Sequence, residues 1–205
     1  MRFLFLTLAA ALLSIAAQAD NHRGLANPNL IDDAALAALP HVDQTLADAI
    51  VAGRPYLNAQ QLDDVVAVQL DESQRAELYG SLFRRLNLNS APESEILLIP
   101  GMNGKMAHEF EEYRPYTSME QFRREIGKYV SAEEVTRLEQ YVFIPAHLND
   151  GKEDDFKQIP GMTAKMVHEF EEYQPYADME EFRREIGKYV DEDEVARLES
   201  YVTLD

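Results

Sequence analysis

Residues 99–113 read Ile-Pro-Gly-Met-Asn-Gly-Lys-Met-Ala-His-Glu-Phe-Glu-Glu-Tyr, and residues 159–173 read Ile-Pro-Gly-Met-Thr-Ala-Lys-Met-Val-His-Glu-Phe-Glu-Glu-Tyr. The two stretches lie 60 positions apart, and their similarity continues as far as Tyr141 and Tyr201. A fainter copy lies another 60 positions upstream, where Leu39-Pro40 and Arg54-Pro55-Tyr56 match the later copies. Because a fixed period indicates one repeated structural unit, the chain is predicted to contain three copies of a small domain.

The first residues have the pattern of a signal peptide. Arg2 supplies a positive charge, residues 3–16 are apolar, and Ala17-Gln18-Ala19 has the small residues of a cleavage site. The alternative is a single membrane anchor, but the apolar run is shorter than the roughly 20 residues that a span needs. We therefore expect residues 1–19 to be removed, and a periplasmic or secreted chain that does not insert into a membrane.

The composition excludes several functional classes. The chain has no cysteine, so disulfides, thiolate catalysis and cysteine-bound zinc are excluded. It has 19 Lys and Arg against 37 Asp and Glu, a net charge of −18, which repels nucleic acid and anionic lipid. With 46% hydrophobic residues it nevertheless has the composition of a folded protein.

Each copy predicts four short helices and no strand. We expect an all-α fold in which residues 20–85 form a divergent first unit, 86–145 a second and 146–205 a third. Capping boxes beginning at Ser90 and Asp150 are expected to start the first helix of units two and three, and Asn29 that of unit one. Met106, Phe110 and Tyr113 have the spacing of an apolar face on the second helix.

The second half of each unit has its own start signals. Residues 117–120 and Asp178 are expected to cap a third helix in units two and three. Asp71, Ser131 and Asp191 begin patterns that cap the last helix. The inward face of this helix is predicted to contain Val135, Leu138 and Val142 in unit two, and Val195, Leu198 and Val202 in unit three.

Residues 89–107 resemble the helix-hairpin-helix module of exported competence DNA receptors of the ComEA type. The matching features are an Asn and Ala before the first helix, then Leu-Ile-Pro-Gly-Met and a basic residue after the hairpin. The continuation Pro115-Tyr116-Thr117-Ser118 is also similar to the extrinsic photosystem II subunit of the same fold, which binds protein. The resemblance implies helix-hairpin-helix units, and it implies either DNA or a protein as partner.

In DNA-binding members of this family, a Gly-x-Gly hairpin presents backbone amides to a phosphate. The resemblance places Gly101, Asn103, Gly104 and Lys105 at this position in unit two, and Gly161 and Lys165 in unit three. Thr163 replaces the second glycine, which is expected to be unfavourable if that position needs a positive φ. In unit one, Asp43 stands at this position and would repel a phosphate.

Two basic clusters are candidate sites for an acidic or phosphorylated ligand. They are formed by Arg123, Arg124 and Lys128 in unit two and by Arg183, Arg184 and Lys188 in unit three. The alternative is that these residues are solvated and pair with Glu120, Glu125 and their neighbours, since runs of charge usually form solvated faces.

The paired His and Glu residues of the second helix are a further candidate site. His108 and Glu112, like His168 and Glu172, are four residues apart and could place two ligands on one ion. Two ligands are too few for a metal site, so an exposed acidic face is the preferred interpretation. The sequence shows no catalytic constellation and no cofactor motif, and we expect no enzymatic activity.

Two functions remain open after these observations. The first is a non-catalytic binding or scaffold protein whose helical units contact a protein partner or other copies of the chain. The second is a DNA-binding or DNA-uptake protein of the competence type that acts through the hairpins of units two and three. The net negative charge favours the first.

Overall fold

The structure is a computed structural model that describes residues 24–204. The expected signal peptide lies outside the described residues. The regular structure of these residues consists mainly of short helices, and the fold class is all-α as predicted. The α-helices are α1 (Asp33–Ala37), α2 (Gln44–Ala52), α3 (Ala59–Val66), α4 (Glu72–Tyr79), α5 (Glu93–Ile96), α6 (Gly104–Glu112), α7 (Met119–Ile126), α8 (Ala132–Leu138), α9 (Glu153–Phe156), α10 (Ala164–Glu172), α11 (Met179–Ile186) and α12 (Glu192–Glu199).

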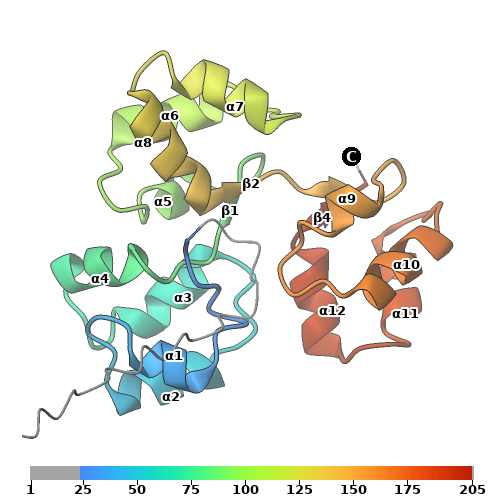
Figure 1. The fold of residues 1–205 in the computed structure, drawn as a ribbon, viewed down its shortest axis with the longest axis horizontal. Helices are drawn as coiled ribbons and strands as arrows, with labels where there is room; N and C mark the ends of the chain where they lie inside the picture. The colour runs from blue at the N-terminus through green and yellow to red at the C-terminus, as the bar shows by residue number, and fades with distance from the viewer. Residues whose placement is uncertain (1–23, 205) are drawn as a thin grey trace, which may run out of the picture.

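Figure 1 shows the helices in three groups of four. We call residues 24–85, with α1–α4, segment one; residues 86–145, with α5–α8, segment two; and residues 146–204, with α9–α12, segment three. No helix within residues 24–204 is long and apolar enough to cross a membrane.

Very short parallel strands close segments two and three, which corrects the prediction of no strand, and a single parallel bridge closes segment one. In segment two, β1 (Leu86–Asn87) pairs with β2 (Val142–Phe143), which follows the 3-10 helix η1 (Glu139–Tyr141). In segment three, β3 (Ala146–His147) pairs with β4 (Val202–Thr203). In segment one a single bridge joins Ala26 to Leu82. Two residues are too few to produce the alternating pattern by which a strand is recognised in a sequence.

The predicted caps of the last two helices are confirmed. Ser118 and Asp178 cap the third helix of segments two and three, and the fourth helices begin after Asp71, Ser131 and Asp191. In each case the side chain accepts a hydrogen bond from a backbone amide of the first turn.

Val135 and Leu138 on α8 and Val195 and Leu198 on α12 are buried as predicted. Val142 and Val202 are also buried, but they lie in β2 and β4, after the helices have ended, so their assignment to the helix face is wrong.

The predicted caps of the first helices are wrong. Asn29, Ser90 and Asp150 all precede the true N-caps, which are Asp32, Pro92 and Lys152. The asparagines have another role, since the Asn29 amide donates to the Tyr56 carbonyl at 2.9 Å and accepts from its backbone N–H at 2.7 Å.

Asn89 makes the same pair of bonds with Tyr116, and Asn149 with Tyr176. These bonds tie the start of each segment to the loop between its second and third helices. Each tyrosine is fully buried beside that loop.

The turn before the second helix needs a left-handed backbone at one position only. Gly101 has φ 78° and Gly161 has φ 73°, and His41 occupies the equivalent position at φ 63°. The expectation that the second glycine position also needs a positive φ is wrong. Asp43, Asn103 and Thr163 are extended N-caps there, with φ values of −87°, −138° and −94°. Thr163 is therefore unstrained.

The hydrophobic core is continuous across segments one and two and separate in segment three. The first cluster extends from Leu25 to Val142 and the second from Leu148 to Val202. Phe83 and Tyr141 pack edge to face across the boundary between segments one and two, with ring centroids 5.1 Å apart.

Arg84 is the main contact between segments one and three. Its side chain is fully buried and donates to the Tyr56 and Leu57 carbonyls at 3.0 and 3.1 Å, and to Ser200 Oγ at 2.7 Å. The guanidinium also lies 4.2 Å from the centroid of the Tyr201 ring. Burial lowers its pKa, but a guanidinium stays charged in proteins. Arg84 thus joins the two separate cores through polar and cation–π contacts.

Replacing Arg84 by Met is expected to lower the free energy of unfolding by about 2–4 kcal/mol, because two buried carbonyls would lose a charged donor. Chemical denaturation followed by circular dichroism measures this loss. Arg184→Met is the matched control, since the Arg184 side chain is 59% exposed and its loss should cost less than about 0.5 kcal/mol. Equal effects of the two substitutions would contradict the role assigned to Arg84.

Gly101→Ala is expected to destabilise the protein by about 1 kcal/mol, because alanine at a positive φ is strained. A Cβ at Gly101 would meet nothing closer than 3.8 Å, so crowding would not contribute. Gly104→Ala, which lies three residues further on and also has room for a Cβ, should cost nothing. Thermal unfolding of both variants tests the expectation, and an unchanged melting temperature for Gly101→Ala would refute it.

Candidate functional site

One amide in the first turn of each second helix, next to the turn where a phosphate was expected to bind, already has an acceptor. The Asn103 side chain accepts from the Met106 N–H at 3.1 Å, and Thr163 Oγ1 accepts from the Met166 N–H at 3.2 Å. In segment one, Asp43 accepts from the Leu46 N–H. An incoming phosphate would have to displace the capping side chain to reach this amide.

The other predicted residues of these turns differ between segments. Gly104 is the first residue of α6, and Lys105 next to it is exposed. In segment three, Lys165 Nζ lies 5.1 Å from the centroid of the Tyr189 ring. The two lysines follow equivalent turns. Lys105 is exposed, whereas the Lys165 ammonium lies over the Tyr189 ring.

The Gly161 turn has a side chain of another segment close by, whereas the nearest atom to a Cβ at Gly101 belongs to Arg137 of the same segment. A Cβ at Gly161 would lie 3.2 Å from the side chain of Leu30 in segment one. Arg197 also donates to the Pro160 carbonyl at 2.7 Å. Nearly identical sequences at the two turns thus have different surroundings.

All six residues of the predicted basic clusters are ion-paired. In segment two, Arg123 pairs with Glu139, whereas Arg124 and Lys128 both pair with Glu125. Segment three repeats the arrangement: Arg183 pairs with Glu199, Arg184 with Glu181 and Glu185, and Lys188 with Glu185.

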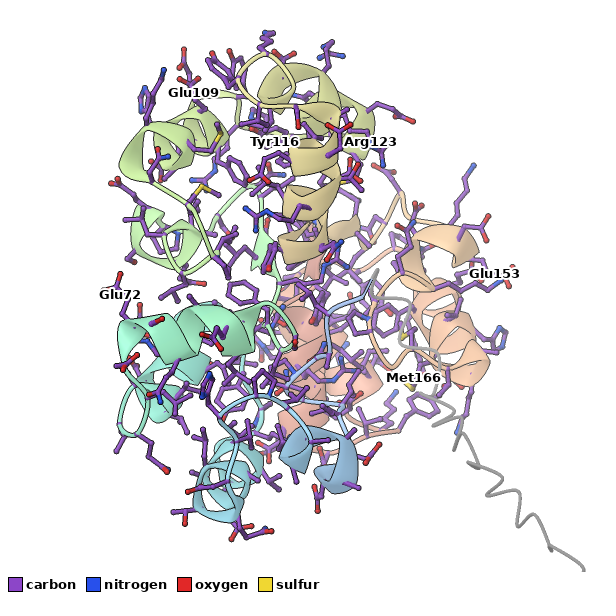
Figure 2. The ribbon with its side chains drawn as sticks, turned by 60° about the vertical axis from the view of Figure 1, so that its left-hand side comes forward. Glu72, Glu109, Tyr116, Arg123, Glu153 and Met166 are labelled. Carbon is purple, nitrogen blue, oxygen red and sulfur yellow. The ribbon has the colours of Figure 1, made fainter. Side chains whose placement is uncertain are left out.

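These ion pairs raise the pKa of Arg123 and Lys128 and lower that of Glu125, so these three groups remain charged near neutral pH. In Figure 2, Arg123 lies on the side of segment two that faces segment three, and Glu109 lies on the opposite side. The cations are thus balanced by acidic neighbours and do not form a positive surface.

One carboxylate of the supposed exposed acidic face is buried, which corrects the sequence interpretation. Glu109 and its counterpart Glu169 are each only 7% exposed. They lie near paired tyrosine hydroxyls, Tyr113 with Tyr129 at 2.8 Å and Tyr173 with Tyr189 at 2.9 Å. The hydrogen bond between the Tyr129 and Tyr113 hydroxyls and the nearby Glu109 raise the pKa of Tyr129. The sequence could have indicated this burial, because position 109 lies on the same helix face as Met106 and Tyr113.

The His–Glu pairs on α6 and α10 lie on the surface. His108 Nε2 is 3.7 Å from a Glu112 oxygen, and His168 Nε2 is 3.4 Å from a Glu172 oxygen. Among residues 24–204, no group of three His, Asp or Glu side chains is arranged to hold a metal ion.

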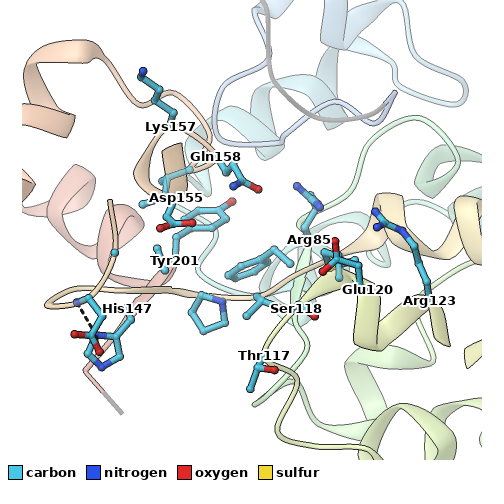
Figure 3. A pocket seen from close by; sticks show the side chains of 18 residues that line it. Arg85, Thr117, Ser118, Glu120, Arg123, His147, Asp155, Lys157, Gln158 and Tyr201 are labelled. Atoms are coloured by element: carbon cyan, nitrogen blue, oxygen red, sulfur yellow. Dashed lines mark hydrogen bonds and ion pairs between the residues drawn. The ribbon is translucent and has the colours of Figure 1, made fainter. Parts of the chain in front are cut away.

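A groove of about 970 Å³ lies between segments two and three (Figure 3). Its walls are the start of α7, the connection from Phe143 to His147, and the residues around α9. Charged, polar and aromatic side chains line it, including Arg123, Glu120, Asp155 and Tyr201. We call this the open groove. The sequence did not indicate it, because its walls come from two units and from the connection between them.

A smaller groove of about 370 Å³ occupies the equivalent junction between segments one and two. Nine of the positions that line it have counterparts, 60 residues later in the sequence, that line the open groove. These are Leu57, Asn58, Arg84, Arg85, Leu86, Asn87, Ser90, Ala91 and Glu95, which correspond to Thr117, Ser118, Ile144, Pro145, Ala146, His147, Asp150, Gly151 and Asp155. We call the smaller one the filled groove, because Arg84 and the end of α12 form part of its lining and leave the smaller volume.

The two grooves differ in how tightly their walls are joined. In the filled groove, Glu95 Oε2 accepts a hydrogen bond at 3.0 Å from the Ala59 N–H at the start of α3. Burial raises the pKa of Glu95, and the Ala59 N–H and the Arg84 charge oppose this shift. In the open groove, the corresponding Asp155 instead accepts from the Lys152 N–H, within its own segment. The walls of the open groove lack this link.

Comparisons with known proteins found no relative: no family model, curated protein or solved structure matches the chain.

Proposed function

We propose that this protein is an exported, non-catalytic binding protein made of three tandem helix-hairpin-helix units, and that it binds a protein partner. The observation that carries the proposal is the open groove. It has a volume of about 970 Å³, within the range of ligand sites, whereas Arg84 of segment one and Ser200 of segment three are joined across its smaller counterpart of about 370 Å³. At the junction between segments one and two, side chains of the chain itself narrow the groove. At the junction between segments two and three, the open groove is available to a partner.

Export and the unit type rest on the sequence. The pattern of residues 1–19 supports export to the periplasm or the extracellular space. The Pro-Gly turns with positive φ at Gly101 and Gly161, each between two short helices, support the helix-hairpin-helix assignment.

DNA binding of the competence type is the second candidate, and one feature favours it. The Gly101 turn has the required backbone and is followed by the exposed Lys105. The capped amides, the paired basic residues and the net charge of −18 all weigh against it.

We expect the protein to bind duplex DNA more weakly than about 10 μM at about 150 mM salt, because few unpaired cations oppose a large negative charge. An electrophoretic mobility shift measures this binding. The double variant Asn103→Gly, Thr163→Gly frees the capped amides and should still not bind. Micromolar binding by the wild type that is lost in Lys105→Glu would favour the DNA-binding function instead.

Selection from a random peptide display library is expected to yield ligands that bind the open groove. Their affinity should fall by about tenfold or more when Ser118→Trp obstructs the groove, a loss of about 1.4 kcal/mol. Asn58→Trp, at the equivalent position of the filled groove, is the matched control and should bind normally if it remains folded. Peptides that bind Ser118→Trp as well as the wild type, or a selection that yields no ligand, would contradict the proposal.

A further inference from the structure

We propose that the open groove recognises a guanidinium group, so that the protein partner inserts an arginine side chain between segments two and three. This inference rests on the proposed function and specifies the chemistry of the partner. It follows from comparing the two grooves, one of which already holds an arginine of the chain itself.

In the filled groove, Arg84 shows how a guanidinium is bound at this place in the fold. Its Nε donates to the Tyr56 carbonyl and its Nη2 donates to the Leu57 carbonyl and to Ser200 Oγ. The guanidinium lies over the rings of Tyr201 and Phe143, at 4.2 and 5.7 Å from their centroids. The Glu95 carboxylate adds a favourable charge interaction.

Beside the open groove lie counterparts of the two carbonyls that Arg84 uses, but none of Ser200. Arg85 and Arg123 line this groove, but neither stands at the position equivalent to Arg84. Position 144, equivalent to Arg84, is Ile144, whose side chain offers no donor. The Tyr116 carbonyl, equivalent to that of Tyr56, accepts only the Asn89 amide among residues 24–204. Within the same range, the Thr117 carbonyl accepts no hydrogen bond.

The open groove also has a carboxylate and aromatic rings, as the surroundings of Arg84 do in the filled groove. Asp155 replaces Glu95, is exposed and lines the groove. Phe143 and Tyr201, which support Arg84 on the filled side, line the open groove as well. Two adjacent carbonyls, a carboxylate and aromatic rings suit the planar fork of a guanidinium better than the point charge of an ammonium.

The charge around the open groove favours a cation despite the basic residues in its walls. Arg123 is paired with Glu139, and Lys157 with Glu153 and Asp154. The lining residues alone balance three cations, Arg85, Arg123 and Lys157, against the carboxylates of Glu120, Asp150 and Asp155. With the partners Glu139, Glu153 and Asp154 included, the same three cations face six carboxylates. The local excess is negative, in agreement with the net charge of −18.

A peptide titration followed by NMR tests the inference. The probe is the capped pentapeptide acetyl-Gly-Gly-Arg-Gly-Gly-amide, added to ¹⁵N-labelled protein. The matched control replaces arginine by citrulline, which has the same shape without the charge. Saturable shifts of the Thr117, Ser118 and Asp155 amides are expected with the arginine peptide, with binding at least about tenfold weaker for citrulline.

Two pairs of variants localise the binding. Ile144→Arg supplies the open groove with an internal arginine, as in the filled groove, and should abolish the shifts, whereas Ile144→Met should leave them. Asp155→Asn should weaken binding by about fivefold or more, because a carboxylate partner is lost. Asp154→Asn changes the net charge equally outside the groove, at a side chain that is 96% exposed, and should change affinity by less than about twofold.

Three outcomes would overturn the inference. They are equal binding of the arginine and citrulline peptides, shifts spread over the acidic surface, and equal effects of Asp155→Asn and Asp154→Asn. The amide spectrum of each variant reports its folding, and the aspartate pair decides the question if Ile144→Arg does not fold. If display-selected peptides bind the open groove without arginine, the proposed function stands and this inference fails. If no peptide binds there, both fail.

Discussion

The short parallel pairing that closes each segment is the constraint on which the rest of the structure depends. Residues 26, 86 and 146 each pair with a residue 56 positions later. The helices between them have at most nine residues, below the roughly 12–15 at which an isolated helix becomes even marginally stable in water. Tertiary contacts must therefore hold these helices, and closure brings both ends of each segment to one core.

Closure also determines where the segments meet. Only a few residues separate the parallel pairing of one segment from that of the next: Phe83–Arg85 between segments one and two, and Ile144–Pro145 between segments two and three. Whatever stands in these connections lies at a junction. At the first connection, Arg84 reaches across to segment three, and at the second, Ile144 cannot make such polar contacts. One difference between two copies of the unit thus accompanies one filled and one open groove.

Much of the fold could be predicted from the sequence, because local signals specify it. The helices follow from apolar spacing, and Ser131 and Asp191 cap their helices as expected. The caps of the first helices were wrong because Asn29 and Asn89 bond to the distant backbone of Tyr56 and Tyr116, and no local pattern reports such a contact.

The candidate site was less predictable for the same reason. The basic residues could be found in the sequence, and pairing with Glu125 was considered as an alternative. The bond from Arg123 to Glu139, however, joins different helices. The open groove depends on how two segments are placed relative to each other. That placement comes from side chains such as Arg84, whose partners lie as far away as Ser200. Spacing within one unit carries no information about it.

The capped turns give a physical reason to regard this chain as different from a phosphate binder. An N-cap side chain stabilises a helix by about 1 kcal/mol by accepting from an amide of the first turn, whereas glycine leaves that amide to an external acceptor. Asp43, Asn103 and Thr163 all cap their helix with a side-chain oxygen, although one is a carboxylate, one an amide and one a hydroxyl. In a chain with many short helices each such cap matters for folding. The same side chain occupies one first-turn amide that would otherwise be open to an external anion, so capping these helices leaves fewer free donors at the turn.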